Sequence, residues 1–435
     1  MNKVRHGLKK VLALVLALTM CFSVGAIAAS AAPAVKHKYP VILVSGLSGY
    51  SPNSKLTKVV GDYWGGVAVG SMAKWLTTNG IQAYETSVGP FSSNWDRACE
   101  LYANIKGGRV DYGAAHSKKA GHERFGRVFP GVYPEWDADH PVDVIAHSMG
   151  APTSIIFTSL LAYGDKDEQA ASPNDCSELF KGGHSKWVNS NTTVCGTNNG
   201  TTLADGILNL ITKLTKDRAK TDEIASSLCG VLGIALQGTD LADLVADPMY
   251  DQWGFAPKAG ETNFAYIQRC LKSNIWKSHD VCWFDMSTEY SRDIHRNHPE
   301  NPDTYYFAIA AKASTDKSST DKKQKHSDNL FILAPLYLAL GNLPTDTVWA
   351  SKENFNPDWY ANDGMVNTAF AKAPFEAKGT REYYDGIVPQ RGTWINMPEI
   401  YVEHSGAVGF YLVLNKTVDM PTYYANHIRW VESLD

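Results

Sequence analysis

The sequence predicts an α/β fold in which helices flank a mostly parallel central sheet. Short apolar runs without polar alternation recur along the chain, and segments with apolar residues at helical spacing lie between them. Such runs are typical of strands covered on both faces, as in parallel sheets. Strands that alternate with helices favour the α/β class.

The expected elements follow in chain order. Strands are predicted over residues 39–46, 81–88, 142–147, 187–195 and 304–310. Helices are predicted over residues 67–79, 151–163 and 423–434.

Two segments interrupt this alternation. Residues 93–133 are rich in Gly, His, Arg and aromatic residues, and we interpret them as an insertion. Residues 203–245 carry apolar residues at helical spacing, which is typical both of a pair of core helices and of a helical lid over a site. We expect a single domain over residues 38–435 that includes the insertion and the lid.

Residues 1–31 have the pattern of a secretory signal peptide. Four basic residues in the first ten positions precede an apolar run, and small residues ending at Ala31 follow it. A membrane anchor is the alternative, but the run is short and ends in small residues. We therefore expect cleavage, secretion to the extracellular space, and no transmembrane anchor in the mature protein.

Charge and composition restrict the class of partner. The chain is 44% hydrophobic and 20% charged, which is ordinary for a globular protein. The formal net charge is −4, and cleavage after Ala31 would change it to −8, because residues 1–31 hold four basic residues and no acidic ones. An acidic protein is a poor candidate for binding nucleic acid, so no such partner is expected.

Six cysteines remain after such a cleavage, and secretion permits disulfides. Their spacing matches no disulfide framework. Bridges between Cys176 and Cys195 or between Cys270 and Cys282 are two options that the spacing does not decide.

The strongest local signal for chemistry is Ala-His-Ser-Met-Gly at residues 146–150, between a predicted buried strand and a predicted helix. Small residues two positions before and after the serine suit a nucleophile elbow, because this tight turn leaves no room for side chains there. We therefore predict that Ser148 is a nucleophile. The N–H of Met149 can then face a developing oxyanion at the start of the helix.

A serine nucleophile needs an imidazole to take its proton and an acid to orient the imidazole. Asp363 lies in an Asn-Asp-Gly turn late in the chain, although such a turn is also typical of solvated loops. His404 follows a short apolar strand, and His427 is its competitor in a predicted helix. The second oxyanion donor is expected at Leu47, in the glycine-containing loop after the first strand.

The insertion carries His116 and His122 in one loop, with Asp96 upstream. Two histidines and carboxylates suit a four-coordinate structural zinc. The spacing matches no short zinc motif, so the residues alone favour surface histidines.

Several segments, taken together, resemble the secreted lipases of thermophilic Bacillus and Geobacillus and of staphylococci. They lie in order from about residue 39 to about residue 409, and the insertion segments are the most specific. These segments are residues 63–66, 92–100, 110–116, 121–127, 146–150, 251–254, 304–306 and 362–364.

The resemblance implies an α/β-hydrolase fold with a zinc-binding insertion and a helical lid, secretion, and hydrolysis of acylglycerols and other carboxyl esters. It implies a catalytic triad and an oxyanion hole, formed by Ser148, Asp363 and His404 and by the amides of Leu47 and Met149. It also implies a structural zinc, bound by Asp96, His116, His122 and Asp251.

The chain departs from the family pattern at three positions. Ser45 stands where the family usually has His, and Ala151 stands where Gly is usual. Gly406 occupies the place of an acidic calcium ligand two residues after His404, which leaves calcium binding there doubtful.

The sequence therefore predicts a secreted serine carboxylester hydrolase, a triacylglycerol lipase that forms an acyl-enzyme on an ester or lipid substrate at a lipid–water interface. One alternative is a soluble esterase without interfacial activation. Another is a non-catalytic zinc-binding protein that kept the fold.

Overall fold

The computed structural model describes most of the chain from residue 37 onward. Outside the described part lie residues 1–36, 53, 55, 56, 216–248, 256–257, 262–264, 266–268, 270–277, 322, 327–356 and 411–417. The predicted signal peptide falls outside it, as does most of the predicted lid.

A seven-stranded sheet forms the centre of the fold, in the order β10-β11-β7-β6-β5-β1-β2. Every pairing in it is parallel, which confirms the predicted fold class. Its strands are β1 (Val41–Val44), β2 (Ala83–Glu85), β5 (Val142–His147), β6 (Val188–Val194), β7 (Tyr305–Ile309), β10 (Arg381–Glu382) and β11 (Trp394–Asn396). The last two strands were not predicted.

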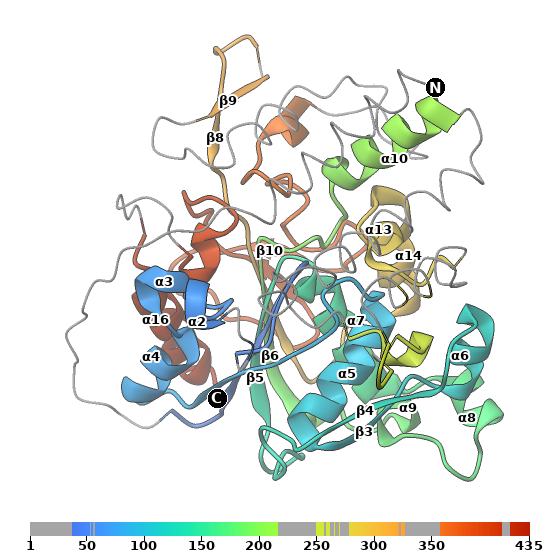
Figure 1. The fold of residues 1–435 in the computed structure, drawn as a ribbon. Helices are drawn as coiled ribbons and strands as arrows, with labels where there is room; N and C mark the ends of the chain where they lie inside the picture. The colour runs from blue at the N-terminus through green and yellow to red at the C-terminus, as the bar shows by residue number, and fades with distance from the viewer. Residues whose placement is uncertain are drawn as a thin grey trace.

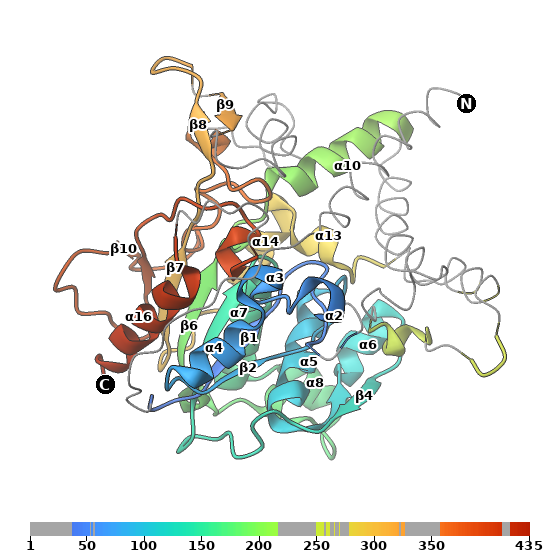
Figure 2. The ribbon, with the colours of Figure 1, turned by 60° about the vertical axis from the view of Figure 1, so that its left-hand side comes forward.

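Helices cover both faces of the sheet, as Figures 1 and 2 show. Successive residues of a strand point to opposite faces, so β1 contributes to two cores. Ile42 and Val44 join the core that contains residues of α5 (Asn94–Lys106) and α7 (Gly150–Tyr163). Val41 and Leu43 join the core that contains residues of α4 (Met72–Thr78) and α16 (Met420–Glu432).

The single helix predicted over residues 67–79 is wrong, because the chain forms two helices there. These are α3 (Gly66–Val69) and α4. Gly70 between them has φ of 79°, a left-handed conformation that interrupts a helix. Ser71 then caps α4 by accepting a hydrogen bond from the Lys74 N–H.

Residues 93–133 contain α5, β3 (Gly108–Asp111), α6 (Ala114–Ala120) and β4 (Phe125–Phe129). The buried residues of α5 share a core with those of α7, so this helix belongs to the layer on the sheet. The antiparallel pair β3–β4 and the helix α6 lie beyond it (Figure 1).

The remaining described elements lie around this frame. The α-helices are α2 (Thr57–Val60), α8 (Lys166–Ala171), α9 (Glu178–Lys181), α10 (Thr202–Thr215), α13 (Cys282–Asp285) and α14 (Thr288–Asn297). Short 3₁₀ turns are η1 (Ser185–Trp187), η3 (Asp251–Trp253), η5 (Pro357–Tyr360) and η6 (Gly406–Val408). The hairpin of β8 (Ser314–Asp316) and β9 (Gln324–His326) extends from the body in Figures 1 and 2.

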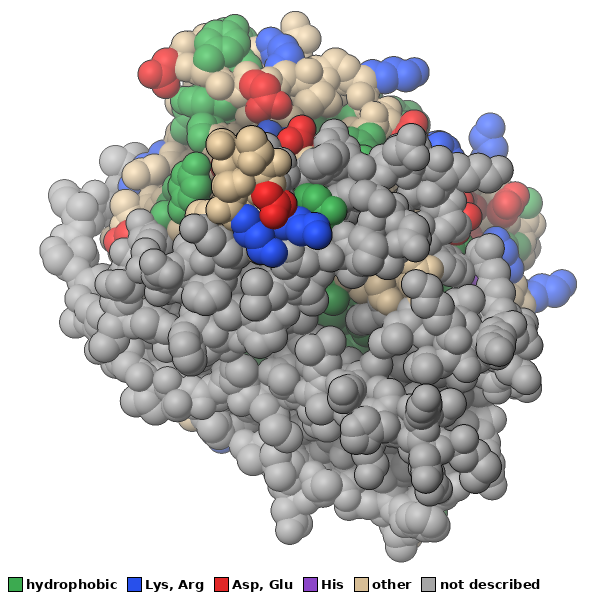
Figure 3. All heavy atoms as spheres, turned by 90° about the horizontal axis from the view of Figure 1, so that it is seen from above, with side chains coloured by type: hydrophobic (Ala, Val, Ile, Leu, Met, Phe, Trp, Pro, Cys, Tyr) green, Lys and Arg blue, Asp and Glu red, His purple; other side chains and the backbone are tan. Residues whose placement is uncertain are grey.

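The face above the carboxyl ends of the strands carries the start of α10 and the β8–β9 hairpin (Figure 1). Seen from above, its described side chains are of mixed type, with Lys and Arg close to Asp and Glu (Figure 3). Within the described part of the chain, no helix is both long and apolar enough to span a bilayer.

The Cys176–Cys195 bridge is wrong, because both residues are free thiols. Cys195 is buried at the end of β6, where its thiol contacts the Asp363 carboxylate. Cys282 is also a free thiol, and Cys270, the other half of the second optional bridge, lies outside the described residues.

Candidate active site and metal centre

Ser148 stands at the corner between β5 and α7, with φ of 57°. A left-handed conformation is strained for a residue other than glycine, and such strain is concentrated at functional sites. Close packing surrounds the corner. A Cβ on Gly46 would lie 2.5 Å from Ser148 Cβ, and one on Gly150 would lie 2.8 Å from the Ser45 carbonyl oxygen. Gly150, one of the two small residues that predicted the elbow, is therefore required by its close approach to the Ser45 backbone.

The structure brings Ser148, His404 and Asp363 together. His404 Nε2 lies 2.9 Å from Ser148 Oγ, and His404 Nδ1 lies 2.8 Å from Asp363 Oδ2. The three side chains are buried, and Asp363 is fully so. A hydroxyl, an imidazole and a carboxylate in this order form the arrangement that activates a serine oxygen.

Two further contacts fix the orientation of the Asp363 carboxylate. Its Oδ1 accepts hydrogen bonds from the N–H groups of Met365 (2.9 Å) and Val366 (2.8 Å). The His404 N–H donates to the Asp363 carbonyl oxygen at 2.9 Å, so the two residues are also joined through their backbones. The Oδ2 atom is thereby left to face the imidazole.

The predicted oxyanion amides belong to segments that pack on Ser148. Leu47 follows Gly46, and Met149 follows the serine. Among the hydrogen bonds between described residues, none uses the N–H of Leu47 or of Met149. Both donors are therefore free to bind a negatively charged oxygen.

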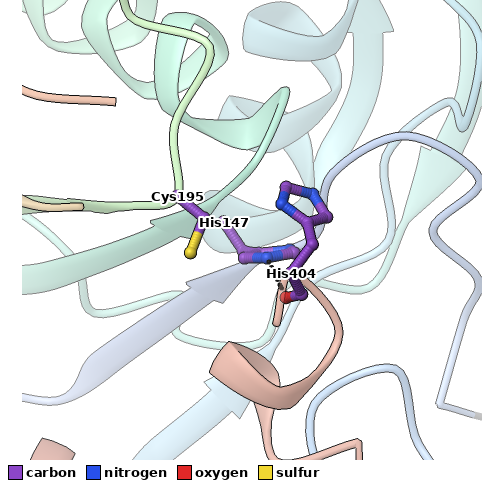
Figure 4. A group of neighbouring side chains, drawn as sticks. All are labelled: His147, Cys195 and His404. Carbon is purple, nitrogen blue, oxygen red and sulfur yellow. Dashed lines mark hydrogen bonds between the residues drawn. The ribbon is translucent and has the colours of Figure 1, made fainter. Parts of the chain in front are cut away.

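His147, Cys195 and His404 place three ligand-type atoms within 4.8 Å of one another (Figure 4). Both ring nitrogens of His147 already have partners, which are Tyr63 Oη at 2.7 Å and the His404 carbonyl oxygen at 3.0 Å. His404 is likewise engaged on both sides by Asp363 and Ser148. Because hydrogen bonds occupy all four ring nitrogens of His147 and His404, we do not interpret the group as a metal site.

His427, the competing candidate base, lies on α16 with its Nε2 atom 2.9 Å from Thr192 Oγ1. Burial lowers its pKa to about 4. Its hydrogen bond ties it to a strand residue and not to Ser148, so its position indicates a structural role.

Asp96, His116, His122 and Asp280 form a second cluster, with one ligand atom from each lying within 4.8 Å of the others. His116 Nε2 lies 3.2 Å from Asp96 Oδ1 and 3.3 Å from Asp280 Oδ1. His122 Nε2 lies 3.2 Å from Asp280 Oδ2 and 3.7 Å from Asp96 Oδ1. The first turn of α5, the α6 region and the chain before α13 supply these side chains.

The residues fit a metal ion. One buried nitrogen or oxygen of each makes no aligned hydrogen bond, and its contacts of 3.2–3.7 Å are with other members of the cluster. These atoms are Asp96 Oδ1, His116 Nε2, His122 Nε2 and Asp280 Oδ2. Such atoms are costly unless something binds them. Burial raises the pKa of Asp96, and the neighbouring Asp280 carboxylate adds to the effect, which a cation would relieve.

Neighbouring groups orient two of these ligands from outside the cluster. His122 Nδ1 donates to the Glu123 carbonyl oxygen at 2.8 Å, which leaves Nε2 free to bind a metal. Gln252 Nε2 donates to Asp96 Oδ2 at 2.8 Å, which leaves Oδ1 directed at the cluster.

The expected fourth ligand, Asp251, is replaced by Asp280. The Asp251 carboxylate is bound by Arg127, with Nε 2.5 Å from Oδ2 and Nη2 3.1 Å from Oδ1. A carboxylate held by both nitrogens of a guanidinium has little capacity left for a metal. Asp280 was missed because no local motif surrounds it, and only the chain path before α13 brings it to α5.

Comparison with known proteins identifies the family. The family described as "Lipase-like, C-terminal domain" matches residues 37–410. The chain belongs to this lipase-like family. Lipase 1 of Staphylococcus aureus (strain NCTC 8325 / PS 47) is 33% identical over 362 residues, which are 82% of this chain and 49% of the relative. The predicted resemblance to staphylococcal lipases is confirmed, and the chain spans about half the length of the curated relatives it matches.

Two solved structures share both the fold and sequence similarity with this lipase-like chain. EstA from Clostridium botulinum has a TM-score of 0.76 and 32% identity, over 93% of this chain and 89% of its own. Staphylococcus hyicus lipase has a TM-score of 0.75 and 30% identity, over 94% of this chain and 98% of its own.

Proposed function

We propose that this member of the lipase-like family is a serine carboxylester hydrolase that acts through an acyl-enzyme. The observation that carries the proposal is the hydrogen-bonded series from Ser148 Oγ through the His404 ring to Asp363 Oδ2, at 2.9 and 2.8 Å. The similarity to proteins named as lipases supports an ester substrate. A non-catalytic role is less consistent with a strained serine and an intact triad geometry.

The reaction begins when His404 takes the proton of Ser148 and the serine oxygen attacks the ester carbonyl. The amides of Leu47 and Met149 stabilise the oxyanion that forms. Removing one such donor costs roughly a hundred- to a thousandfold in rate. His404 then protonates the leaving alcohol, and it later activates the water that releases the acid. Asp363 holds the imidazole in the tautomer that leaves Nε2 free to accept the proton.

The metal cluster supports a structural role. Two imidazoles and two carboxylates form a ligand set that suits zinc, which would be bound by Asp96, His116, His122 and Asp280. When bound, the metal supplies charge compensation for the two carboxylates. It would also join α5, α6 and the segment before α13.

Secretion and an interfacial substrate are part of the proposal. Residues 1–31 have the composition of a cleavable export signal. The predicted lid begins within α10 and continues outside the described residues. If an apolar lid covers the site, hydrolysis should accelerate when a substrate such as tributyrin exceeds its solubility. A smooth saturation curve through that limit would favour the soluble-esterase alternative.

Ser148→Ala tests the proposed function. The variant should lose p-nitrophenyl butyrate hydrolysis by at least about a thousandfold while its melting temperature stays close to that of the wild type. Ser154→Ala is a matched control, because Ser154 is a buried serine of α7 whose Oγ donates to the Ala151 carbonyl. A folded Ser148→Ala variant with near-wild-type turnover would refute the assignment.

A further inference from the structure

The peptide that joins Ser45 to Gly46 is held at both of its polar atoms. The Ser45 carbonyl oxygen accepts a hydrogen bond from Arg97 Nη2 at 2.5 Å, and the Gly46 N–H donates to Tyr63 Oη at 3.0 Å. A peptide group is planar, so contacts at its oxygen and its nitrogen fix its orientation.

The next peptide of this loop carries the Leu47 N–H. Its carbonyl oxygen, on Gly46, accepts a hydrogen bond from the Gly49 N–H at 3.2 Å. In a trans peptide the C=O and N–H point in opposite directions, so the Leu47 N–H is directed away from Gly49. Gly46 itself lies against Ser148, since a Cβ there would be 3.0 Å from Ser148 Oγ. The orientation of the Ser45–Gly46 peptide, together with the Gly49 hydrogen bond to the next peptide, therefore sets where the Leu47 N–H points relative to the serine.

Only one assignment of protons satisfies the contacts of Tyr63. Because the Gly46 N–H is a donor, Tyr63 Oη accepts from it, and the phenolic proton is left for His147 Nδ1 at 2.7 Å. His147 Nε2 must then carry a proton, which it donates to the His404 carbonyl oxygen at 3.0 Å. Hydrogen bonds thus run without interruption from the oxyanion loop to the backbone of the catalytic histidine.

The protonation states of both side chains agree with this assignment. Burial lowers the pKa of His147 well below its usual range, and the neighbouring His404 adds to the effect, so the ring is neutral. Burial raises the pKa of the Tyr63 phenol, which therefore keeps its proton at neutral pH.

Arg97 holds the same peptide from the other side. It is fully buried on α5, and its other hydrogen bonds go to the Gly89 carbonyl (2.5 Å) and to Thr153 Oγ1 on α7 (2.9 Å). Burial lowers its pKa to about 10, so it remains charged at neutral pH. The guanidinium therefore ties the oxyanion loop to the helix that begins just after Ser148.

We propose that Tyr63 is a positioning residue of the reaction, whose phenol orients the Ser45–Gly46 peptide and so directs the Leu47 N–H toward the oxyanion. This inference rests on the proposed function. Loss of the phenol leaves two groups without partners, the Gly46 N–H and His147 Nδ1, and frees the loop to rotate. The loss raises the free energy of the transition state more than that of the bound substrate, because the negative charge on the oxygen develops only in the transition state.

Tyr63→Phe tests the proposal with a short, soluble ester. We expect kcat for p-nitrophenyl butyrate to fall at least about tenfold, which is less than the loss of a direct oxyanion donor, while KM changes less than about twofold. n-Butylboronic acid forms a tetrahedral adduct on a nucleophilic serine and needs the oxyanion donors. Its inhibition constant should rise by a factor similar to the fall in kcat. Loss of a residue that only stabilises the fold would lower the melting temperature without lowering kcat at a nearly unchanged KM.

Tyr306→Phe is the matched control. Tyr306 Oη also accepts from a backbone N–H, that of Asn301 at 2.8 Å, and donates to a side chain, Thr158 Oγ1 at 3.0 Å. Its phenol thus makes the same two kinds of hydrogen bond, without contacting the loop or Ser148. We expect a loss of thermal stability in this variant with kcat within twofold of the wild type.

The outcomes separate this inference from the proposed function. A wild-type protein without esterase activity, or an active Ser148→Ala variant, would refute the proposed function. If those two behave as expected, a folded Tyr63→Phe variant whose kcat and boronate inhibition stay within twofold of the wild type would overturn the role of Tyr63 alone. Equal losses of kcat in Tyr63→Phe and Tyr306→Phe would also overturn it.

His147→Gln replaces Tyr63→Phe if the latter does not fold. Glutamine keeps a donor close to the position of Nε2 for the His404 carbonyl and removes the ring acceptor of the Tyr63 proton. A fall in kcat of roughly threefold or more with unchanged KM would support the role of the hydrogen bond between Tyr63 and His147. A kcat equal to that of the wild type would overturn it.

Discussion

Asp363→Asn is the substitution whose effect follows most directly from the site geometry. Asp363 Oδ1 accepts hydrogen bonds from the N–H groups of Met365 and Val366, so an asparagine must place its own oxygen there. Its NH₂ group then occupies the position of Oδ2, 2.8 Å from His404 Nδ1. That nitrogen must accept a hydrogen bond from the amide, and the ring proton moves to Nε2.

The consequence is an imidazole that cannot take the proton of Ser148, since its Nε2 is already protonated. In a Ser-His-Asp triad, the same substitution lowers kcat by roughly ten-thousandfold through the wrong tautomer. We expect a fall of about a thousand- to ten-thousandfold here. At about 1.4 kcal/mol for each factor of ten, the barrier rises by about 4 to 5.5 kcal/mol.

Initial rates of p-nitrophenyl butyrate hydrolysis at pH 8, together with thermal unfolding, measure this effect. Asp143→Asn serves as the control, because Asp143 is a buried acid of β5 that accepts from Asn189 Nδ2 and Ser190 Oγ. It should keep kcat near the wild-type value. An Asp363→Asn variant that folds and retains more than a tenth of wild-type kcat would contradict the tautomer argument.

Three further outcomes are expected. Asp280→Asn should bind zinc at least a hundredfold more weakly, which at saturating metal removes about 2.7 kcal/mol of stabilisation, while Asp251→Asn keeps the metal. Metal content and melting temperatures with and without chelator measure this effect, and the reverse pattern would restore Asp251 as the ligand. His427 has a pKa lowered to about 4 by burial, against about 6.5 when unfolded. Between pH 7 and pH 4.5, His427 takes up a proton in the unfolded state but not in the folded state, so the free energy of unfolding falls as the pH is lowered. In urea unfolding over this range, the His427→Gln variant should lose about 2 kcal/mol less stability than the wild type. Equal losses of stability in the wild type and the variant would refute the lowered pKa of His427. Gly46→Ala should abolish esterase activity, because its Cβ would lie 2.5 Å from Ser148 Cβ, and near-wild-type activity would show that the loop can move aside.

Much of the fold and of the active-site geometry could be predicted because the signals are local. The strand over Val142–His147 is a continuous apolar run, and the small residues around Ser148 are needed wherever a strand turns sharply into a helix. Chain order then limited the acid and the base to residues late in the sequence. Asp363 and His404 were chosen on this ground, and the structure places both beside the serine.

What could not be predicted depends on contacts that are distant in sequence. Asp280 meets α5 only through the path of the chain before α13, and no neighbouring residue marks it as a ligand. The pairing of Asp251 with Arg127 depends on a contact across 124 positions. The last two strands of the sheet, β10 and β11, contain only two and three residues, too few for a pattern to emerge.

One local signal in the sequence argues against a single helix over residues 67–79. Gly70 followed by Ser71 is the usual sequence of a helix end and a helix N-cap, and it divides the segment that was predicted as a single helix.

The nucleophilic role of Ser148 is the central claim, and covalent labelling tests it most directly. The protein would be treated with a fluorophosphonate, digested and mapped by mass spectrometry, with the Ser148→Ala and His404→Ala variants treated in parallel. We expect one adduct per chain, on the peptide that contains Ser148, with no labelling of Ser148→Ala and labelling slowed by at least about a hundredfold in His404→Ala. An esterase-active protein that carries its adduct on another residue, or that remains unlabelled, would contradict the account.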